Sequence, residues 1–246
     1  SWWKKLLLSY NYYFDSNRHI LLNNLESLKI LNINHFEIQE TPSLNESSIN
    51  NIRAFLNEKK IDNFLIFHPS AQYQYKLYPA FYRNNLLVLL SKLGVNILIT
   101  GGKTKIDYEI KNSLPLLPNV FDLIGETSLE EYFALSSMCD AYIGMDTLNM
   151  HIAASQNKRI FAIFGPTKLS MWSPWSNHLK KCSSEDSPFQ TYSNVSIFQA
   201  NLPCVACGNA GCDDKHGKSI CLDNISPNFI FKKIESWYLN CPRKMV

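Results

Sequence analysis

Five short apolar runs, separated by amphipathic stretches, constrain the fold of this chain more than any other feature of its sequence. The runs are of strand length, rich in β-branched and aromatic residues, and lack apolar–polar alternation: 64–67, 95–99, 120–124, 141–143 and 159–164. Such runs are typical of parallel strands that are covered on both faces. The alternation of strands with helices predicts an α/β protein with a Rossmann-like, doubly wound parallel sheet.

The stretches between the runs carry signals for the ends of helices. Apolar residues recur at roughly helical spacing between residues 81 and 93, and Gly94 follows where a helix commonly ends. Ser128, with Glu131 three residues later, forms a capping box. Pro227 stands near the start of the last helical pattern, where proline is favoured.

Residues 1–60 differ from the rest of the chain. Leucines between residues 21 and 31 indicate a helix, whereas residues 40–48 are polar and loop-like. This part has too few strand-like runs for a complete α/β domain. We therefore divide the chain into 1–60, the remnant of an N-terminal domain with its linker, and 61–246, a Rossmann-like domain. Within the second part, residues 167–226 are rich in loops.

The composition of the chain bears on its partners. With 246 residues, 46% hydrophobic and 18% charged, it is typical of a globular protein. A net charge of +3, without clustered Lys and Arg beside stacking aromatics, gives no indication of nucleic acid as a partner. No apolar run is long enough to cross a bilayer. The opening residues 1–14 fit either an amphipathic segment on a membrane surface or a helix that is buried in its own context.

Polar or glycine-rich segments follow four of the five runs. In an open parallel sheet, ligands bind outside the carboxyl ends of the strands, so we expect these segments to meet at one edge. They hold Ser70 and Lys76 after the first run, Gly101 and Gly102 after the second, Gly125 to Ser128 after the third, and Asp146 and Thr147 after the fourth.

The segment after the fourth run has the chemistry of a diphosphate site. From Leu148 onward a helix begins, whose first N–H groups lack intrahelical partners and lie at the positive end of its dipole. His151 lies about one turn inside, and Lys76 contributes a positive charge from the loop after the first run. The alternative interpretation is structural: Asp146 and Thr147 cap the helix, and His151 is a core residue. A dinucleotide-dependent dehydrogenase is disfavoured, because no G-x-G-x-x-G follows the first run.

Three parts of the sequence resemble glycosyltransferase family 9, the ADP-heptose:lipopolysaccharide heptosyltransferases. They are the stretch 125–175, the KLYP sequence at 76–79 and the cysteine-bearing tail 202–227, and the likeness runs from about Phe64 to the end. The resemblance implies a GT-B architecture of two Rossmann-like domains. This chain then holds the C-terminal, nucleotide-sugar-binding domain over 61–246, and most of the N-terminal acceptor domain is missing.

The resemblance also implies an activity and its partners. The activity is an inverting transfer of heptose from ADP-heptose to the inner core of lipopolysaccharide, with no cofactor required. The partners are ADP-heptose, a lipid-linked core oligosaccharide as acceptor and, peripherally, the surface of the inner membrane on its cytoplasmic side. Two alternatives remain: a protein O-heptosyltransferase with the same donor, and a truncated nucleotide-binding fragment without turnover.

By resemblance, the donor-binding residues are assigned one at a time. Lys76 binds the donor diphosphate, while a pocket for phosphate and sugar is formed by Asp146, Thr147, Leu148, Asn149 and His151. Gly101 and Thr127 fall near the adenosine, and Ser70 supplies a hydroxyl from the first loop. Leu148 stands where the family usually has glycine. The expected acidic contact to the ribose is not obvious, and Asp107 and Glu109 are its candidates.

The resemblance leaves the catalytic residues unassigned. In the family, the general base is an acid in a loop after the first strand of the N-terminal domain, and this chain shows no such strand and loop before residue 60. We therefore expect the chain to bind nucleotide better than it turns substrate over.

Four cysteines are crowded near the C-terminus. Cys204, Cys207, Cys212 and Cys221 form the pattern C-x2-C-x4-C-x8-C, and four thiolates close in sequence can surround a tetrahedral ion. Three interpretations stay open: a structural zinc or iron that holds the loop at about 200–226, free thiols, or disulfides.

Overall fold

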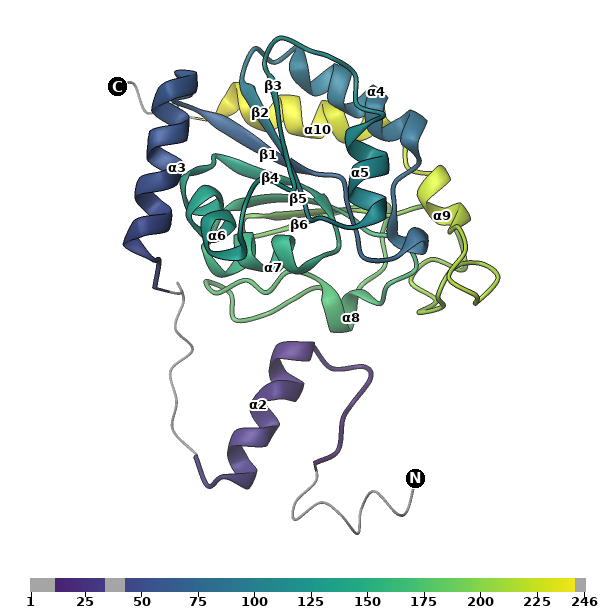
Figure 1. Ribbon diagram of the computed structural model, residues 1–246. Coiled ribbons are helices and arrows are strands. Elements are labelled where there is room, and N and C mark those ends of the chain that lie inside the picture. Colours follow the sequence, from purple (N-terminus) through teal and green to yellow (C-terminus); the bar gives the residue numbers. More distant parts are fainter. Residues whose placement is uncertain (1–11, 34–42, 242–246) are drawn as a thin grey trace.

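The computed structural model describes residues 12–33 and 43–241, and Figure 1 shows a twisted sheet with helices on both of its faces. The membrane-surface interpretation of the first residues falls mainly on 1–11, which lie outside the described residues. No helix in the described ranges has both the length and the apolar character that a membrane crossing requires.

A seven-stranded sheet forms the centre of the molecule. Its strands are β1 (Phe64–His68), β2 (Asn96–Gly101), β3 (Val120–Ile124), β4 (Ala141–Met145), β5 (Arg159–Ile163), β6 (Phe189–Tyr192) and β7 (Val195–Phe198). Their spatial order is β3-β2-β1-β4-β5-β7-β6. All neighbouring strands are parallel except the β6–β7 pair. The five runs predicted as strands and the doubly wound parallel sheet are thereby confirmed.

Strands β6 and β7 were not predicted. They lie within 167–226, which is otherwise rich in loops as expected. β7 pairs in parallel with β5, and β6 returns beside it as a hairpin. The turn between them places Ser193 in the left-handed region, with a φ of 48°. Each strand has only four residues. A pattern this short does not distinguish a strand from a loop, so the pairing with β5 decides the conformation.

The helices begin and end close to the predicted signals. They are α2 (Ile20–Ile30), α3 (Glu46–Lys59), α4 (Ala80–Ser91), α5 (Lys105–Lys111), α6 (Leu129–Met138), α7 (Leu148–Ser155), α8 (Leu169–Trp172), α9 (Ile220–Asp223) and α10 (Pro227–Asn240), with a short 3₁₀ turn, η1 (Gln74–Lys76). The capping box of Ser128 and Glu131 opens α6, and Pro227 stands in the first turn of α10. Both predictions are confirmed.

The helices bury both faces of the sheet. α4, α5 and α10 pack on one face, where Leu65 and Phe67 of β1 point, whereas α3, α6 and α7 pack on the other, where Phe64 and Ile66 point. Figure 1 shows these two layers, with α10 crossing behind the strands. Because the β1 side chains on both faces of the sheet are buried, neither face of this strand favours polar residues. This explains the continuous apolar runs in the sequence.

The expected loop at 40–48 ends earlier than predicted, because α3 already begins at Glu46. The side chain of Asn45 accepts hydrogen bonds from the amides of Ser47 and Ser48 and so caps the helix. Ile52 and Leu56, one turn apart, are buried in the same cluster as β1 residues. The packing of this face against the sheet domain outweighs the poor helix propensity of the polar first turn.

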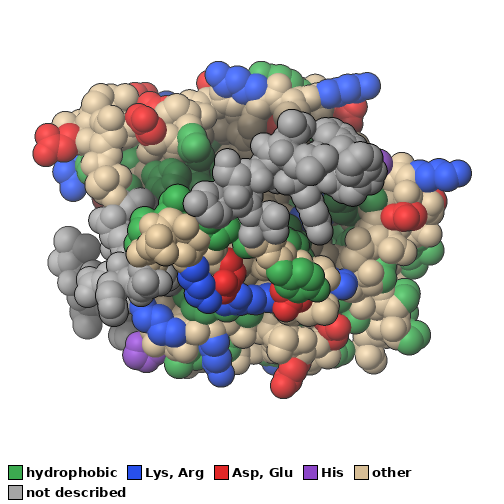
Figure 2. All heavy atoms as spheres, turned by 90° about the horizontal axis from the view of Figure 1, so that it is seen from below, with side chains coloured by type: hydrophobic (Ala, Val, Ile, Leu, Met, Phe, Trp, Pro, Cys, Tyr) green, Lys and Arg blue, Asp and Glu red, His purple; other side chains and the backbone are tan. Residues whose placement is uncertain are grey.

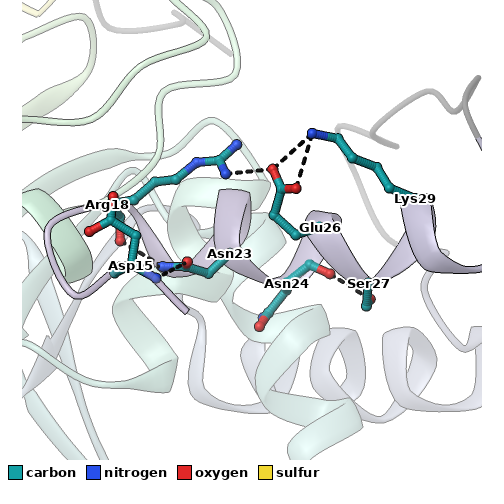
Figure 3. Close-up of polar contacts among 7 residues, drawn as sticks. All are labelled: Asp15, Arg18, Asn23, Asn24, Glu26, Ser27 and Lys29. Atoms are coloured by element: carbon teal, nitrogen blue, oxygen red, sulfur yellow. Dashed lines mark hydrogen bonds and ion pairs between the residues drawn. The ribbon is translucent and has the colours of Figure 1, made fainter. Parts of the chain in front are cut away.

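The N-terminal segment folds back on itself before α2. Asn23 is fully buried, and its side chain donates to the carbonyl oxygens of Asp15 and Arg18 and accepts from the amide of Asp15 (Figure 3). On the outer side of α2, Glu26 pairs with Arg18 and Lys29. Figure 2, which views the molecule from this side, shows acidic and basic side chains next to one another. Such exposed pairs contribute little, so the buried amide of Asn23 holds the turn.

His19 fastens this segment to the sheet domain. Its Nε2 lies 2.8 Å from the carbonyl oxygen of Ser173, and its ring lies 5.2 Å from that of Trp175. The side chain is buried, and burial lowers its pKa below the ordinary value. A neutral imidazole therefore joins two segments that are far apart in the sequence.

The buried His68 at the end of β1 predicts an acid-sensitive fold. Burial lowers the pKa of His68 to about 4, while its Nδ1 lies 2.9 Å from Thr100 Oγ1. The unfolded chain therefore binds more protons than the folded one as the pH falls from 6.5 to about 4, and the stability present above pH 6.5 is lost across that window. We expect His68→Asn, which keeps a polar group for Thr100 but does not titrate, to reduce the loss between pH 7.5 and pH 5 by about 2 kcal/mol.

Urea unfolding at the two pH values measures this difference. His178→Asn serves as the control, because it removes a histidine from the exposed surface. Equal acid losses in wild type and His68→Asn would contradict the prediction.

Candidate functional site

A cavity of about 800 Å³ opens at the carboxyl ends of the strands. The loops that follow β1, β2, β4 and β5 line it, together with Ser16 of the N-terminal segment and part of the loop 201–219. The expectation that polar segments after successive strands meet at one edge of the sheet is thus met for three of the four segments. The segment after β3 does not contribute to the lining.

The cavity lies where the order of the strands reverses. β2 pairs with one side of β1 and β4 with the other, so the connections after β1 and β4 leave the sheet in different directions. Gly144 allows the two strands to lie close together at this point. A Cβ at this position would clash with the carbonyl oxygen of His68 and the hydroxyl of Tyr142.

An ion pair joins the loops after β1 and β4. Lys76 Nζ lies 2.8 Å from Asp146 Oδ2, and the two side chains are 20% and 5% exposed. Lys76 also lies over the ring of Trp172, 6.0 Å from its centroid. Both members of the pair line the cavity. The nearly buried carboxylate of Asp146 therefore holds the ammonium group of Lys76 at the cavity wall and balances its charge.

Helix α7 presents its first turn to the cavity. Thr147 is the N-cap residue, yet its side chain makes no capping hydrogen bond, and Leu148 and Asn149 behind it also line the cavity. The first amides of the helix are therefore available for an acceptor in the cavity, at the positive end of the helix dipole. The geometry is that of a small anion site.

His151 lies one turn further along α7 and borders the same cavity. Burial lowers its pKa to about 4; Asp146 opposes this effect, whereas His19 and Lys76 add to it. The imidazole is therefore neutral at pH 7. A neutral imidazole can donate a hydrogen bond to a ligand or accept one from it. It adds no second positive charge beside the ammonium group of Lys76.

Asp107 joins the loops after β1 and β2. It accepts hydrogen bonds from Ser70 Oγ, from the amide of Gly102 at 2.9 Å, and from the amide and hydroxyl of Thr104 at 2.9 Å and 2.6 Å. Burial alone raises the pKa of Asp107, but these donors outweigh it and lower the pKa below its ordinary value. All of these bonds are internal. Asp107 is thus a clip between two loops. It also lines the cavity, so the ribose contact for which it is a candidate stays a prediction.

The donor-binding residues assigned from the sequence fall into two groups. Those that line the cavity are Ser70, Lys76, Asp146, Thr147, Leu148, Asn149 and His151. Gly101 and Thr127 are outside its lining, and Gly102, Thr104 and Asp107 line the wall near β2 instead. The other candidate for the ribose contact, Glu109, pairs with Lys105 and borders a different cavity.

Several cavity residues were missing from the donor-binding residues that were assigned from the sequence. Lys168, Met171 and Trp172 come from the segment after β5. Their position behind the fifth apolar run is the signal that could have found them. Ser16 and Asn209 also line the cavity, but they lie far from any strand end. Only the packing of the N-terminal segment and of the loop 201–219 brings them there.

The four clustered cysteines do not form a metal site in the part of the chain that the structure describes. Cys204, Cys207 and Cys212 are exposed, Cys221 is buried, and all four are free thiols. Burial raises the pKa of Cys221 to about 11, and the neighbouring Cys212 and Cys207 add to this effect. Among the described residues no group of three or more potential ligands has a metal-binding arrangement.

The strand order and the cavity at the reversal point define a Rossmann-like α/β domain. A family model described as glycosyltransferase family 9 (heptosyltransferase) matches residues 10–201. The chain belongs to this family.

Curated relatives of the chain carry heptosyltransferase names. Lipopolysaccharide heptosyltransferase 3 of Escherichia coli is 27% identical over 165 residues, which cover 65% of this chain and 48% of that protein. Lipooligosaccharide heptosyltransferase 2 of Campylobacter jejuni subsp. jejuni serotype O:6 is 25% identical over 240 residues, 91% of this chain and 67% of that protein. The chain thus spans about half of the length of the first relative and two thirds of the second.

Solved structures share the fold. A glycosyltransferase of family 9 from Veillonella parvula superposes with a TM-score of 0.69 at 15% identity, over 94% of this chain and 63% of that one. The E. coli heptosyltransferase WaaC, solved with ADP, gives 0.61 at 15% identity, over 94% and 60%. The fold is therefore that of the GT-B heptosyltransferases.

Both carboxylate oxygens of Asp107 accept hydrogen bonds, so we predict that both are required to hold the loop after β2 in place. Asp107→Asn replaces one acceptor by a donor and leaves a buried partner unsatisfied. We expect a loss of about 1–3 kcal/mol of unfolding free energy and faster hydrogen exchange at the amides of Gly102 and Thr104.

Chemical denaturation and amide exchange by NMR measure the two effects. Glu109→Gln, on the same helix but exposed, is the matched control and should change the unfolding free energy by less than about 0.5 kcal/mol. Unaltered protection of both amides in Asp107→Asn would refute the clip.

Proposed function

We propose that the protein is an inverting glycosyltransferase that transfers heptose from ADP-heptose to the core of lipopolysaccharide, and that this chain supplies its donor-binding domain. The observation that carries the proposal is the Lys76–Asp146 pair beside the open first turn of α7, in a cavity at the reversal point of the sheet. In this proposal residues 61–246 form the donor domain, and residues 1–60 are the end of the acceptor domain with its linker.

The donor diphosphate accounts for the positive groups of the cavity. Its oxygens accept hydrogen bonds from the ammonium group of Lys76 and from the first amides of α7, at Leu148 and Asn149. Lys76 is already held by Asp146, so little side-chain freedom is lost when the donor binds. The same groups face the charge that develops on the β-phosphate as the sugar leaves, which is where electrostatic stabilisation accelerates a reaction.

The volume and the remaining walls suit a nucleotide sugar. A cavity of about 800 Å³ lies within the range of pockets that enclose small organic ligands. Neutral His151 and the carboxylate of Asp146 provide acceptors and donors for sugar hydroxyls. Gly102 and Thr104, which the Asp107 clip fixes, form the wall that we assign to the nucleoside.

The transfer itself requires one more group. The acceptor oxygen attacks the anomeric carbon, the bond from that carbon to the β-phosphate oxygen breaks with inversion, and ADP keeps the electron pair. The proton of the acceptor hydroxyl passes to a general base. The proposal places this base in the N-terminal acceptor domain and assigns it to no residue of 61–246.

The acceptor side of the proposal rests on the relatives and on one wall of the cavity. The relatives are named as lipopolysaccharide and lipooligosaccharide enzymes, which favours a lipid-linked core oligosaccharide over a protein acceptor. Lys168 and Trp172 line the cavity beside Lys76. A cation and an indole ring at this wall suit a phosphorylated saccharide. An enzyme with this acceptor works in the cytoplasm, at the inner face of the inner membrane.

Calorimetry with ADP tests the donor site. We expect the chain to bind ADP, and Lys76→Met to weaken the binding by about ten- to a hundredfold, since a hydrogen bond to a charged group contributes roughly 1.5–3 kcal/mol. Lys59→Met, which removes the same charge from the exposed end of α3, should bind as wild type does. The absence of heat at millimolar ADP, or equal affinities for wild type and Lys76→Met, would refute the donor site.

Transfer is tested separately on a protein that includes the complete acceptor domain. ADP-heptose and truncated core acceptors should give a heptosylated product with inverted anomeric configuration. Binding of ADP without any transfer by that longer protein would support a nucleotide-binding protein without turnover.

A further inference from the structure

A second cavity, of about 350 Å³, lies on the other side of the loop that carries Lys76. Gln74, Leu77 and Tyr78 of this loop line the second cavity, whereas Tyr75 and Lys76 line the first. Its other walls come from the start of α4, from α5 and from the residues around α9, three helices that Figure 1 shows on the same side of the molecule. The donor site described above does not use this cavity.

The guanidinium group of Arg83 in the wall of this cavity has no carboxylate partner. The residue is only 5% exposed, and its hydrogen bonds go to neutral groups: Nε to Asn84 Oδ1 at 3.1 Å and Nη2 to Ser113 Oγ at 2.7 Å. Among the described residues, no carboxylate oxygen lies within 4.0 Å of its nitrogens. An arginine side chain stays charged, and a buried charge without a counter-ion is strongly unfavourable. Burial accordingly lowers the pKa of Arg83.

The start of α4 adds a second positive element at the same place. This helix has twelve residues, and its N-cap, Pro79, makes no side-chain capping hydrogen bond. Pro79, Ala80 and Arg83 all line the cavity, so the start of α4, with the free amide of Ala80, borders the same space as Arg83. A helix N-terminus favours an anion, and a cation one turn inside it is the opposite of what the dipole stabilises. The two features are compatible when an anion lies between them.

The other charged groups of the cavity lie nearer to solvent. Lys218 adds a further cation from an exposed position. Glu109 pairs with Lys105 at 3.8 Å and its side chain is 58% exposed, and Asp223 is exposed at the end of α9. Water screens these acids, so they do not neutralise a guanidinium group that is buried.

We propose that this second cavity is a binding site for a small oxyanion, a phosphate or a carboxylate group, held by the guanidinium fork of Arg83 and by the amide of Ala80 at the start of α4. The fork of arginine donates two parallel hydrogen bonds to either kind of oxyanion, and helix N-termini bind both. A bound anion neutralises Arg83 and rests against the reverse side of the loop that carries Lys76.

Phosphate titrations test the site in a protein whose donor cavity lacks its ammonium group. In Lys76→Met, inorganic phosphate should raise the unfolding temperature saturably, by about 2–4 °C, beyond the effect of sodium chloride at equal ionic strength. The double variant Lys76→Met/Arg83→Met should lose this response. Lys76→Met/Lys59→Met, which removes a positive charge elsewhere, should keep it. This design does not depend on ADP binding, so its outcome is separate from that of the proposed function.

Arg83→Met without anion distinguishes anion binding from a purely structural role. We expect it to unfold at the same temperature as its parent or higher, because the substitution removes an uncompensated charge. Arg83→Lys keeps the charge without the fork and should respond to phosphate only weakly. A response to acetate in place of phosphate, again lost with Arg83→Met, identifies a carboxylate as the ligand. The proposal fails if phosphate and acetate act no more strongly than chloride, or if the response persists in Arg83→Met.

Discussion

The reversal of strand order between β1 and β4 is the constraint on which the site depends. With β2 on one side of β1 and β4 on the other, the two loops that follow must diverge, and the space between them becomes the cavity. Gly144 lets the strands approach closely at that point, and the ion pair of Lys76 with Asp146 then spans the opening. The pair links the two loops that diverge at the reversal point. The position of this ion pair therefore follows from the order of the strands, and its charges follow from the lysine and the aspartate at these two positions.

The loop after β1 lies between the two cavities described above. One side of it presents Lys76 to the cavity that we assign to the donor, and the other side borders the cavity of Arg83. Ser219 also holds this loop, because its hydroxyl donates to the carbonyl oxygen of Tyr75. The position of one ammonium group thus depends on contacts made by both faces of a short segment.

Much of the site could be predicted because strand ends are visible in the sequence. Asp146, Thr147 and His151 follow an apolar run, Lys76 follows another, and parallel strands bring such segments to one edge. Asp107 shows the limit of this reasoning. The sequence offers it as an acid near the second strand, but it gives no sign that the carboxylate accepts hydrogen bonds from Ser70, Gly102 and Thr104 and so joins two loops. Hydrogen-bond direction depends on side-chain geometry, which spacing along the chain does not specify.

The sequence by itself determined the alternation of buried strands and helices, the helix ends at Ser128 and Pro227, and the family to which the chain belongs. These are properties of local pattern, and local pattern is sufficient for them. The tertiary structure alone decided that four-residue segments become β6 and β7, that Ser16 reaches the cavity through the anchor of His19, and that Arg83 is buried without a counter-ion. Each of these outcomes depends on contacts between residues distant in the sequence, where packing and pairing outweigh local preference.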